Sequence, residues 1–382
     1  MPGFATIVHK KFVITFLAQI TVSFVYCLLV PTLPLYFSRR SYSEMEIGVL
    51  IGSLGLSSLM LRPFVGRFLQ KTSEVRFMMV GTFLFTLTSI LLIWEPPLGF
   101  LLGVRVFQGV ACAFFYTAAV TFVAHHSPEG RLGQSISYYY LGFHIALVLA
   151  PSLGISIINA LDFRWLFAFC ALLSFLSLLL TLVLRKTPFD PASEGQRGED
   201  AFLSRQAIPA AIVVFFASMT YGGIGAFFPL FAIEKGMSNP GHFFSTFAAT
   251  VIVGRSIGSR MLDLYSRRAV IGPCLGAYVA ALGLLFSFEN PTMFLVSAAI
   301  WGLGHALLFP ALIAHTLETT APLRGPAMGT ILAFDDLGIG LGPVVMGLLL
   351  PWTGFHKMFL LLALLGIFNL VYFRFLVRKK IL

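Results

Sequence analysis

A motif in the first half of the chain returns roughly 193 positions later, inside a second apolar segment. The run from Arg62 to Gln70 is echoed by the run from Arg255 to Asp263. Other pairs stand at nearly the same offset: Arg131 with Arg324, Tyr26 with Tyr221, Pro34 with Pro229, and Pro151 with Pro343. A chain that repeats itself over half its length, and is apolar in both halves, is most simply a duplicated membrane protein.

Composition supports a membrane protein. Of the 382 residues, 58% are hydrophobic and 11% are charged, with a mean hydropathy of +0.89. A soluble protein carries about 25% charged residues. Apolar runs of about 20 residues, each able to cross ~30 Å of hydrocarbon, recur along the chain. Because they are continuously apolar rather than alternating, a β-barrel is excluded. We therefore predict an all-α polytopic membrane protein.

The apolar runs predict twelve transmembrane helices in two six-helix bundles related by a parallel repeat. The first bundle occupies residues 1–184 and the second 207–382, joined by a polar linker at 185–206. The predicted spans are 12–37, 44–66, 76–94, 98–123, 132–160, 163–184, 207–233, 241–262, 269–287, 292–317, 326–350 and 354–376.

The net charge of +10 reflects membrane topology rather than a nucleic-acid surface. With the N-terminus placed inside, most Lys and Arg fall on the inner side, which is the positive-inside bias. Both termini are then cytoplasmic, and a bacterial cytoplasmic membrane is expected. The His9-Lys10-Lys11 start resembles a signal peptide, but the apolar run that follows is long and lacks a clear cleavage site, so we expect a retained helix.

The sequence offers no enzyme signature. It has no Gly-Lys-Ser/Thr phosphate loop, and His125-His126 lacks the spacing of a zinc helix. The four cysteines fall inside spans at unrelated spacings, as expected for buried thiols: Cys27, Cys112, Cys170 and Cys274. We expect no cofactor, no metal and no catalytic activity.

Several motifs carry a family resemblance. Gly66 is followed by Gln70 in the first copy, where the second copy has Asp263. The fourth span contains Leu101-x-x-x-Arg105-x-x-Gln108-Gly109, and the eleventh contains Gly338-x-Gly340-x-Gly342-Pro343. With the twelve spans and the duplication, the whole chain resembles the major facilitator superfamily, whose members typically show Gly-x-x-x-Asp-Arg-x-Gly-Arg-Arg after the second helix. Because Gln70 replaces that Asp, a cytoplasmic latch in the first half must be built differently.

The resemblance implies a transporter with a central cavity, acting as a monomer on a small-molecule substrate in the lipid bilayer. We expect proton-coupled efflux (antiport) of a drug or metabolite. Proton-coupled uptake (symport), a lipid transporter and a non-transporting sensor are the alternatives. Gate pairing or snorkelling accounts for Arg62 and Arg255, near the cytoplasmic ends of their helices, and Gly66 and Asp263 belong to the same cytoplasmic gate motif.

Asp335 and Asp336 are the costliest intramembrane residues, because an uncompensated charge at mid-bilayer costs at least ~2.5–3.5 kcal/mol. Adjacent helical residues diverge by about 100°, so one is expected to line the pathway while the other pairs with a neighbouring helix. A proton relay is favoured over a structural bond to an arginine such as Arg62.

The remaining candidates are polar residues within spans. Arg105 either snorkels or, with Gln108, serves proton coupling or binds a substrate anion. His144 and His305 either shuttle protons or satisfy a backbone carbonyl. Expected cavity-lining residues lie on the first and seventh helices: Gln19, Ser23, Tyr26, Ser218 and Tyr221. The Gly-x-x-x-Gly pairs predict close helix packing: Gly48/Gly52, Gly254/Gly258 and Gly338/Gly342.

Overall fold

The computed structural model describes residues 9–69, 71–128, 131–186, 204–319 and 324–378. Helices make up nearly all of these described residues, and they contain no strand. The chain packs into two compact units. Unit 1 comprises Met1–Val30 and Leu56–Arg197, and unit 2 comprises Pro31–Gly55 and Gly198–Leu382. Most of the predicted linker lies outside the described residues.

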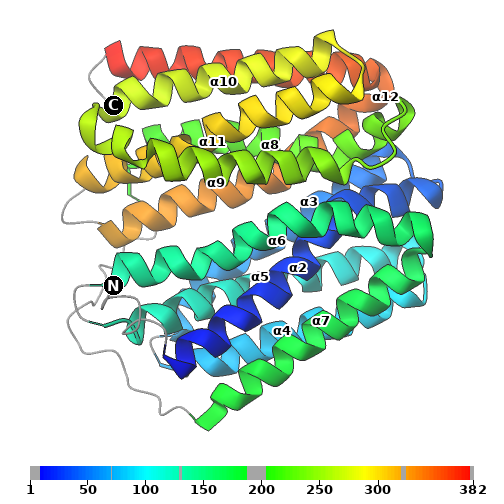
Figure 1. Ribbon diagram of the computed structural model, residues 1–382, viewed down its shortest axis with the longest axis vertical. Helices are drawn as coiled ribbons and strands as arrows, with labels where there is room; N and C mark the ends of the chain where they lie inside the picture. The colour runs from blue at the N-terminus through cyan, green and yellow to red at the C-terminus, as the bar shows by residue number, and fades with distance from the viewer. Residues whose placement is uncertain (1–8, 70, 129–130, 187–203, 320–323, 379–382) are drawn as a thin grey trace. The chain divides into compact units, whose positions relative to one another are not determined.

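Unit 1 is built from the helices of the first half of the chain. Within it, α4 packs against α5 and α7 (Figure 1). The elements are α2 (Lys10–Arg39), α3 (Glu44–Leu69), α4 (Glu74–Ile93), α5 (Leu98–His125), α6 (Leu132–Ala160), α7 (Phe163–Val183) and the short η1 (Leu184–Lys186). The last part of α2 and the first part of α3 belong to unit 2.

Unit 2 contains the helices of the second half. Its neighbouring pairs are α8 with α12, α9 with α11, and α10 with both α11 and α12. In Figure 1 the red C-terminal part of α12 lies beside α10. The elements are α8 (Ile208–Glu234), α9 (Gly241–Leu264), α10 (Arg267–Ser287), α11 (Pro291–Thr319) and α12 (Arg324–Arg378).

The long helix α12 is two spans joined by a kink. Gly354 has φ 66° and ψ 170°, a left-handed backbone that glycine adopts without a Cβ penalty, and Pro351 precedes it. The kink coincides with the start of the twelfth predicted span, so the prediction of twelve helical segments is confirmed. Counting α12 once, ten helices in the described ranges are long and apolar enough to cross a membrane; α9 is not among them.

Local chemistry fixes several helix starts. At α3, Ser43 Oγ accepts from the Glu46 backbone N–H at 3.3 Å, and Glu46 Oε2 accepts from the Ser43 N–H at 2.8 Å. This reciprocal pair is a capping box. At α7, the Asp162 carboxylate accepts from the Phe163 N–H at 2.6 Å. Proline begins α11 at Pro291, where a missing N–H costs nothing.

The predicted glycine pairs lie where helices approach most closely. A Cβ at Gly48 or Gly52 on α3 would clash with backbone carbonyls of α12, at Pro343 and Gly340. The pair Gly338/Gly342 meets α8 in the same way, and Gly254/Gly258 would meet Ala306 and Leu307 of α11. Close packing is therefore confirmed at all three pairs. The four cysteines are buried, as expected.

Candidate functional site

The two adjacent aspartates of α12 lie in different surroundings. Asp335 is partly exposed and accepts a hydrogen bond from the Ser218 hydroxyl of α8 at 2.5 Å. Asp336 is only 5% exposed. This divergence agrees with the roughly 100° turn between neighbouring helical residues. Of the two, Asp335 has the access that proton exchange requires.

His305 belongs to an aromatic cluster in unit 2. Its Nδ1 is 2.6 Å from the Tyr278 hydroxyl of α10, so one of the two groups donates to the other. Its ring lies 6.2 Å from that of Tyr221 on α8 and 5.2 Å from that of Phe247 on α9. The Trp301 ring lies 5.5 Å from Tyr221. The cluster therefore joins four helices around one histidine.

The Tyr278 hydroxyl of α10 bonds to His305, and Asp335 on α12 of the same unit bonds to Ser218. We use the term "unit 2 cluster" for Ser218, Tyr221, Tyr278, Trp301, His305 and Asp335. Three of its members are partly exposed: Tyr221, His305 and Asp335. Unit 2 thus contains a carboxylate, an imidazole and several aromatic side chains on neighbouring helices.

In unit 1, Arg105 and Gln108 form a pair on α5. Arg105 Nη1 donates to Gln108 Oε1 at 2.6 Å, and the two residues are 5% and 0% exposed. The Gln108 Nε2 makes no hydrogen bond with any residue that the structure describes. The two polar residues that the sequence motif of the fourth span placed together are therefore directly bonded, and their role in coupling or substrate binding stays a prediction.

The polar stripe of α2 bonds into the interior of unit 1. Gln19 Oε1 accepts from the Tyr139 hydroxyl at 2.5 Å, and Ser23 Oγ lies 3.4 Å from the Tyr116 hydroxyl. Both stripe residues are fully buried, whereas Tyr26 is partly exposed. The stripe thus has a structural part at Gln19 and Ser23, and Tyr26 has the access expected of a cavity residue.

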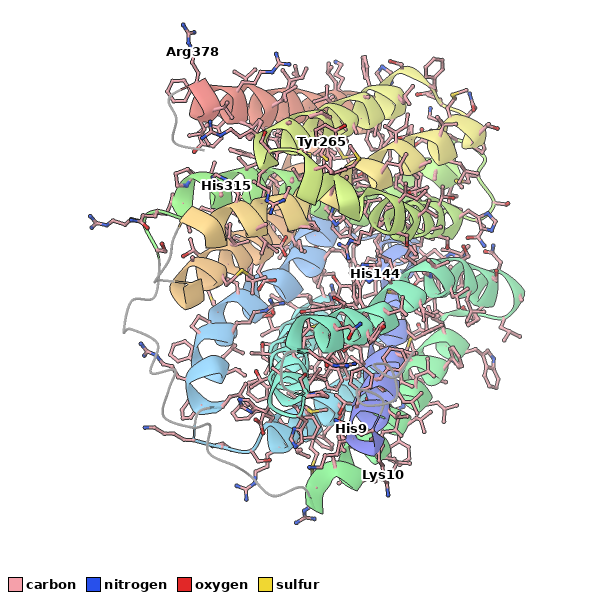
Figure 2. All side chains as sticks on the ribbon, turned by 60° about the vertical axis from the view of Figure 1, so that its left-hand side comes forward. His9, Lys10, His144, Tyr265, His315 and Arg378 are labelled. Atoms are coloured by element: carbon pink, nitrogen blue, oxygen red, sulfur yellow. The ribbon has the colours of Figure 1, made fainter. Side chains whose placement is uncertain are left out.

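His144 lies on α6, where Figure 2 labels it. Its Nδ1 is 2.8 Å from the Tyr140 carbonyl oxygen, and its ring stands 6.0 Å from that of Phe143. A histidine Nδ1–H bonded to a carbonyl of the preceding turn is a satisfied polar group. The Tyr140 carbonyl is therefore a backbone partner of the kind that the sequence analysis gave as the alternative to proton shuttling for His144.

The residues expected at a cytoplasmic gate have separate local partners. Arg62 Nε donates to Ser58 Oγ at 3.3 Å, and Arg255 Nε donates to the Ala306 carbonyl at 3.4 Å. Gly66 is exposed, and a Cβ there would meet nothing within 4 Å. The Asp263 side chain lies outside the described part of the chain. The gate assignment stays a prediction.

Sequence reasoning missed several aromatic members of these clusters: Tyr116, Phe143, Phe247, Tyr278 and Trp301. Tyr278 and Tyr116 stand on other helices than the polar residues they contact: Tyr278 is 27 positions from His305, and Tyr116 is 93 positions from Ser23. The abundance of phenylalanine and tyrosine was the available signal, but it marks no single position. In the described residues, no group of three or more His, Cys, Asp or Glu could hold a metal ion.

Known proteins of similar sequence include an export protein, an MFS-type transporter and a drug-resistance protein. The staphylopine export protein of Staphylococcus aureus is 23% identical over 84% of each chain. An uncharacterized MFS-type transporter of Salmonella typhimurium is 27% identical over 91% of each chain. The quinolone resistance protein NorA of Staphylococcus aureus is 20% identical over 84% of this chain and 85% of that protein.

Solved transporters share the fold. The nucleoside transporter NupG matches with a TM-score of 0.78 at 15% identity, covering 96% of this chain and 98% of its own. A bacterial homolog of the human lysosomal transporter Spinster matches with a TM-score of 0.74 at 12% identity over 95% of each chain. The family model described as Major Facilitator Superfamily matches residues 15–257 and 240–381. With its all-helical fold of two bundles, the chain belongs to the major facilitator superfamily of transporters.

Proposed function

We propose that this protein exports a small organic molecule in exchange for protons, working by alternating access, with Asp335 as the proton acceptor. The observation that carries the proposal is the bond from Ser218 to a partly exposed Asp335 inside a membrane-spanning helix. Asp335 stands 11 residues into α12, about 16 Å from its start at ~1.5 Å per residue. That is near the middle of a ~30 Å hydrocarbon layer.

A carboxylate at this depth is costly unless it has a role. In the unit 2 cluster, Asp335 has a hydroxyl donor in Ser218, and the same unit contains the bond between Tyr278 and His305. Ionisable residues in such positions mark pathways and proton relays. Taking up a proton removes the charge, so the protonation state of Asp335 changes the free energy of exposing this face of unit 2 to either side.

The direction of transport is proposed from the relatives. Among the similar proteins are a staphylopine export protein, a quinolone resistance protein and a multidrug resistance protein of Bacillus subtilis, which are 23%, 20% and 23% identical to this chain. Together with the inner position of most basic residues, this favours a bacterial cytoplasmic membrane with both termini cytoplasmic. Export then moves the substrate from the cytoplasmic side, where both termini lie, to the outer side of the membrane.

The test uses purified protein in vesicles that carry a proton gradient, with a pH-sensitive dye inside and a panel of candidate substrates outside. Antiport predicts that substrate and protons move in opposite directions, and symport reverses the relative sign. We expect Asp335→Asn to reduce gradient-driven flux at least about tenfold while substrate exchange without a gradient persists. The matched control is Asp336→Asn, which removes the neighbouring, buried carboxylate.

Each outcome has a clear meaning. Loss of gradient-driven flux in Asp335→Asn with retention in Asp336→Asn supports the proposal. Full pH-dependent flux in Asp335→Asn would contradict it. Movement of a lipid between leaflets, independent of any soluble substrate, would point instead to a lipid transporter.

A further inference from the structure

A histidine caps the start of α2. His9 precedes the helix, and its carbonyl oxygen accepts a hydrogen bond from the Val13 N–H at 3.0 Å. The His9 Nδ1 accepts from the Phe12 N–H at 3.1 Å. A residue with both bonds is the N-cap of its helix, and its side chain satisfies a backbone donor that has no partner inside the helix. The usual N-cap residues, serine, threonine, aspartate and asparagine, do not titrate between about pH 5 and pH 8, whereas histidine does.

The other ring nitrogen of His9 connects the same helix to α5. Its Nε2 lies 3.0 Å from the carbonyl oxygen of His126, the residue that follows α5. His9 and His126 line one pocket together with Phe12 and Phe122, which are both buried. Figure 2 labels His9 beside Lys10, where α2 begins. One imidazole therefore joins the first turn of α2 to the end of α5.

The two bonds of the His9 ring require a neutral imidazole. A backbone N–H only donates, so Nδ1 must carry a lone pair, and a carbonyl oxygen only accepts, so Nε2 must carry the hydrogen. A second proton on His9 would bind to Nδ1 and place an N–H against the Phe12 N–H. The positive end of the helix dipole would also repel the new charge. Protonation therefore breaks the cap and moves the ring away from the helix start.

The groups around His9 that carry charge or titrate are mostly basic. They come from the four helices that meet at this end of unit 1: Lys10 and Lys11 on α2, Glu74 on α4, His125 and His126 at the end of α5, and Arg131 before α6. Glu74 is the carboxylate of this set, and its Oε1 is already bonded to His125 Nδ1 at 2.5 Å. The adjacent lysines repel a positive charge on His9.

We propose that His9 is a proton-sensitive clasp, which holds the start of α2 to the end of α5 while its ring is neutral and releases both when it takes up a proton. Under the topology proposed above, this end of unit 1 faces the cytoplasm, so acidification there loosens the first transmembrane helix. The clasp uses none of the residues assigned to transport. It lies in unit 1, whereas the proposed proton acceptor Asp335 lies in unit 2.

The experiment is hydrogen–deuterium exchange of the full-length protein in lipid nanodiscs at about pH 7.5 and about pH 5.5, without gradient or substrate. Protection factors are corrected for the intrinsic exchange rate, which itself changes with pH. In the unmodified protein, we expect protection of the first turn of α2, at residues 12–15, to fall at least about threefold at the lower pH, because a helix loses its N-cap. The end of α5 should lose protection with it, because its carbonyl loses the His9 donor.

His9→Asn is the discriminating variant. Asparagine caps a helix and does not titrate, so protection of the first turn should agree within about twofold between the two pH values. His9→Ala removes the cap, and protection should be low at both. The matched control is His242→Asn, the same change at an exposed histidine of α9, which should retain the acid-induced loss at α2. His126→Gln keeps the backbone carbonyl that His9 bonds and should retain this loss too.

Equal protection of the first turn at the two pH values in the unmodified protein would overturn the inference, and so would an undiminished acid-induced loss in His9→Asn. Disappearance of the loss in His126→Gln would assign it to that histidine and refute the role of His9. Loss of protection at α2 without any at the end of α5 would refute the connection between the two helices. Absence of proton-linked flux would refute the proposed function and leave the clasp standing, since its exchange is measured without transport.

Discussion

Gly52→Ala should destabilise the protein because α3 and α12 touch at their backbones. A Cβ at Gly52 would clash with the Gly340 carbonyl oxygen and lie 2.8 Å from Val344 Cγ2. The carbonyl cannot rotate away, so the two helices must separate. Adding a methyl group to a filled interior typically costs about 1–3 kcal/mol. The substitution also gains about 0.5–1 kcal/mol, because alanine favours a helix more than glycine does.

Gly66→Ala is the matched control on the same helix. A Cβ at Gly66 would have nothing within 4 Å, so only the helix-propensity gain applies. Because that gain is common to both variants, it cancels in their comparison. Gly52→Ala should therefore be less stable than Gly66→Ala by about 1–3 kcal/mol. Gly66→Ala itself should be at least as stable as the unmodified protein.

The assay exploits the four cysteines, which are all buried: Cys27, Cys112, Cys170 and Cys274. A thiol-reactive fluorophore reports their exposure as the protein is heated. We expect the midpoint for Gly52→Ala to lie below those of Gly66→Ala and the unmodified protein. If Gly52→Ala and Gly66→Ala melt together, the backbone contact between α3 and α12 does not contribute as the structure implies, and the reasoning is refuted.

Two further predictions concern unit 1. Tyr139→Phe removes the donor to Gln19 and leaves a buried amide oxygen unsatisfied, so the melting midpoint should fall by the equivalent of about 1–3 kcal/mol. The control Tyr140→Phe, at a position that is 42% exposed, should change the midpoint little. Equal midpoints for the two variants would contradict this prediction. Burial lowers the pKa of His126 below its ordinary value of 6.5. Because the unfolded chain then binds the proton more readily, the contribution of neutral His126 is complete above about pH 6.5 and is lost as the pH falls. Melting curves between about pH 5 and pH 8 should show less acid sensitivity in His126→Gln, and identical pH profiles would count against the assignment.

The helices could be predicted from the sequence because they depend on local properties. Span length follows from bilayer thickness and a rise of about 1.5 Å per residue, so continuous apolar runs mark each helix. The capping box at Ser43 and Glu46 fixes the start of α3 within four residues of sequence. The glycine pairs could also be recognised, since spacing by four places both residues on one helix face. Their partners on α8, α11 and α12 could not.

The site was only partly predictable, because only some of its features depend on local sequence. Asp335, Arg105 and Gln108 were recognisable because polar residues inside apolar runs are costly. Tyr278 and Trp301 were not, because an aromatic residue in an apolar helix looks the same whether it packs in a core or contacts a histidine. Gln19 was predicted to line a cavity together with Tyr26, but its burial against Tyr139, 120 positions away, depends on how α2 and α6 pack.

The sequence by itself therefore determined a duplicated, twelve-helix membrane protein and the short set of intramembrane polar residues. Only the tertiary structure decided that Ser218 bonds to Asp335, while Asp336 lies buried. It also decided that Gln108 turns its oxygen to Arg105, while its buried Nε2 has no hydrogen-bond partner among the described residues. Hydrophobic length and helical period are properties of consecutive residues. The partner of a side chain depends on the rotation and packing of helices that lie a hundred or more residues apart, which no local pattern encodes.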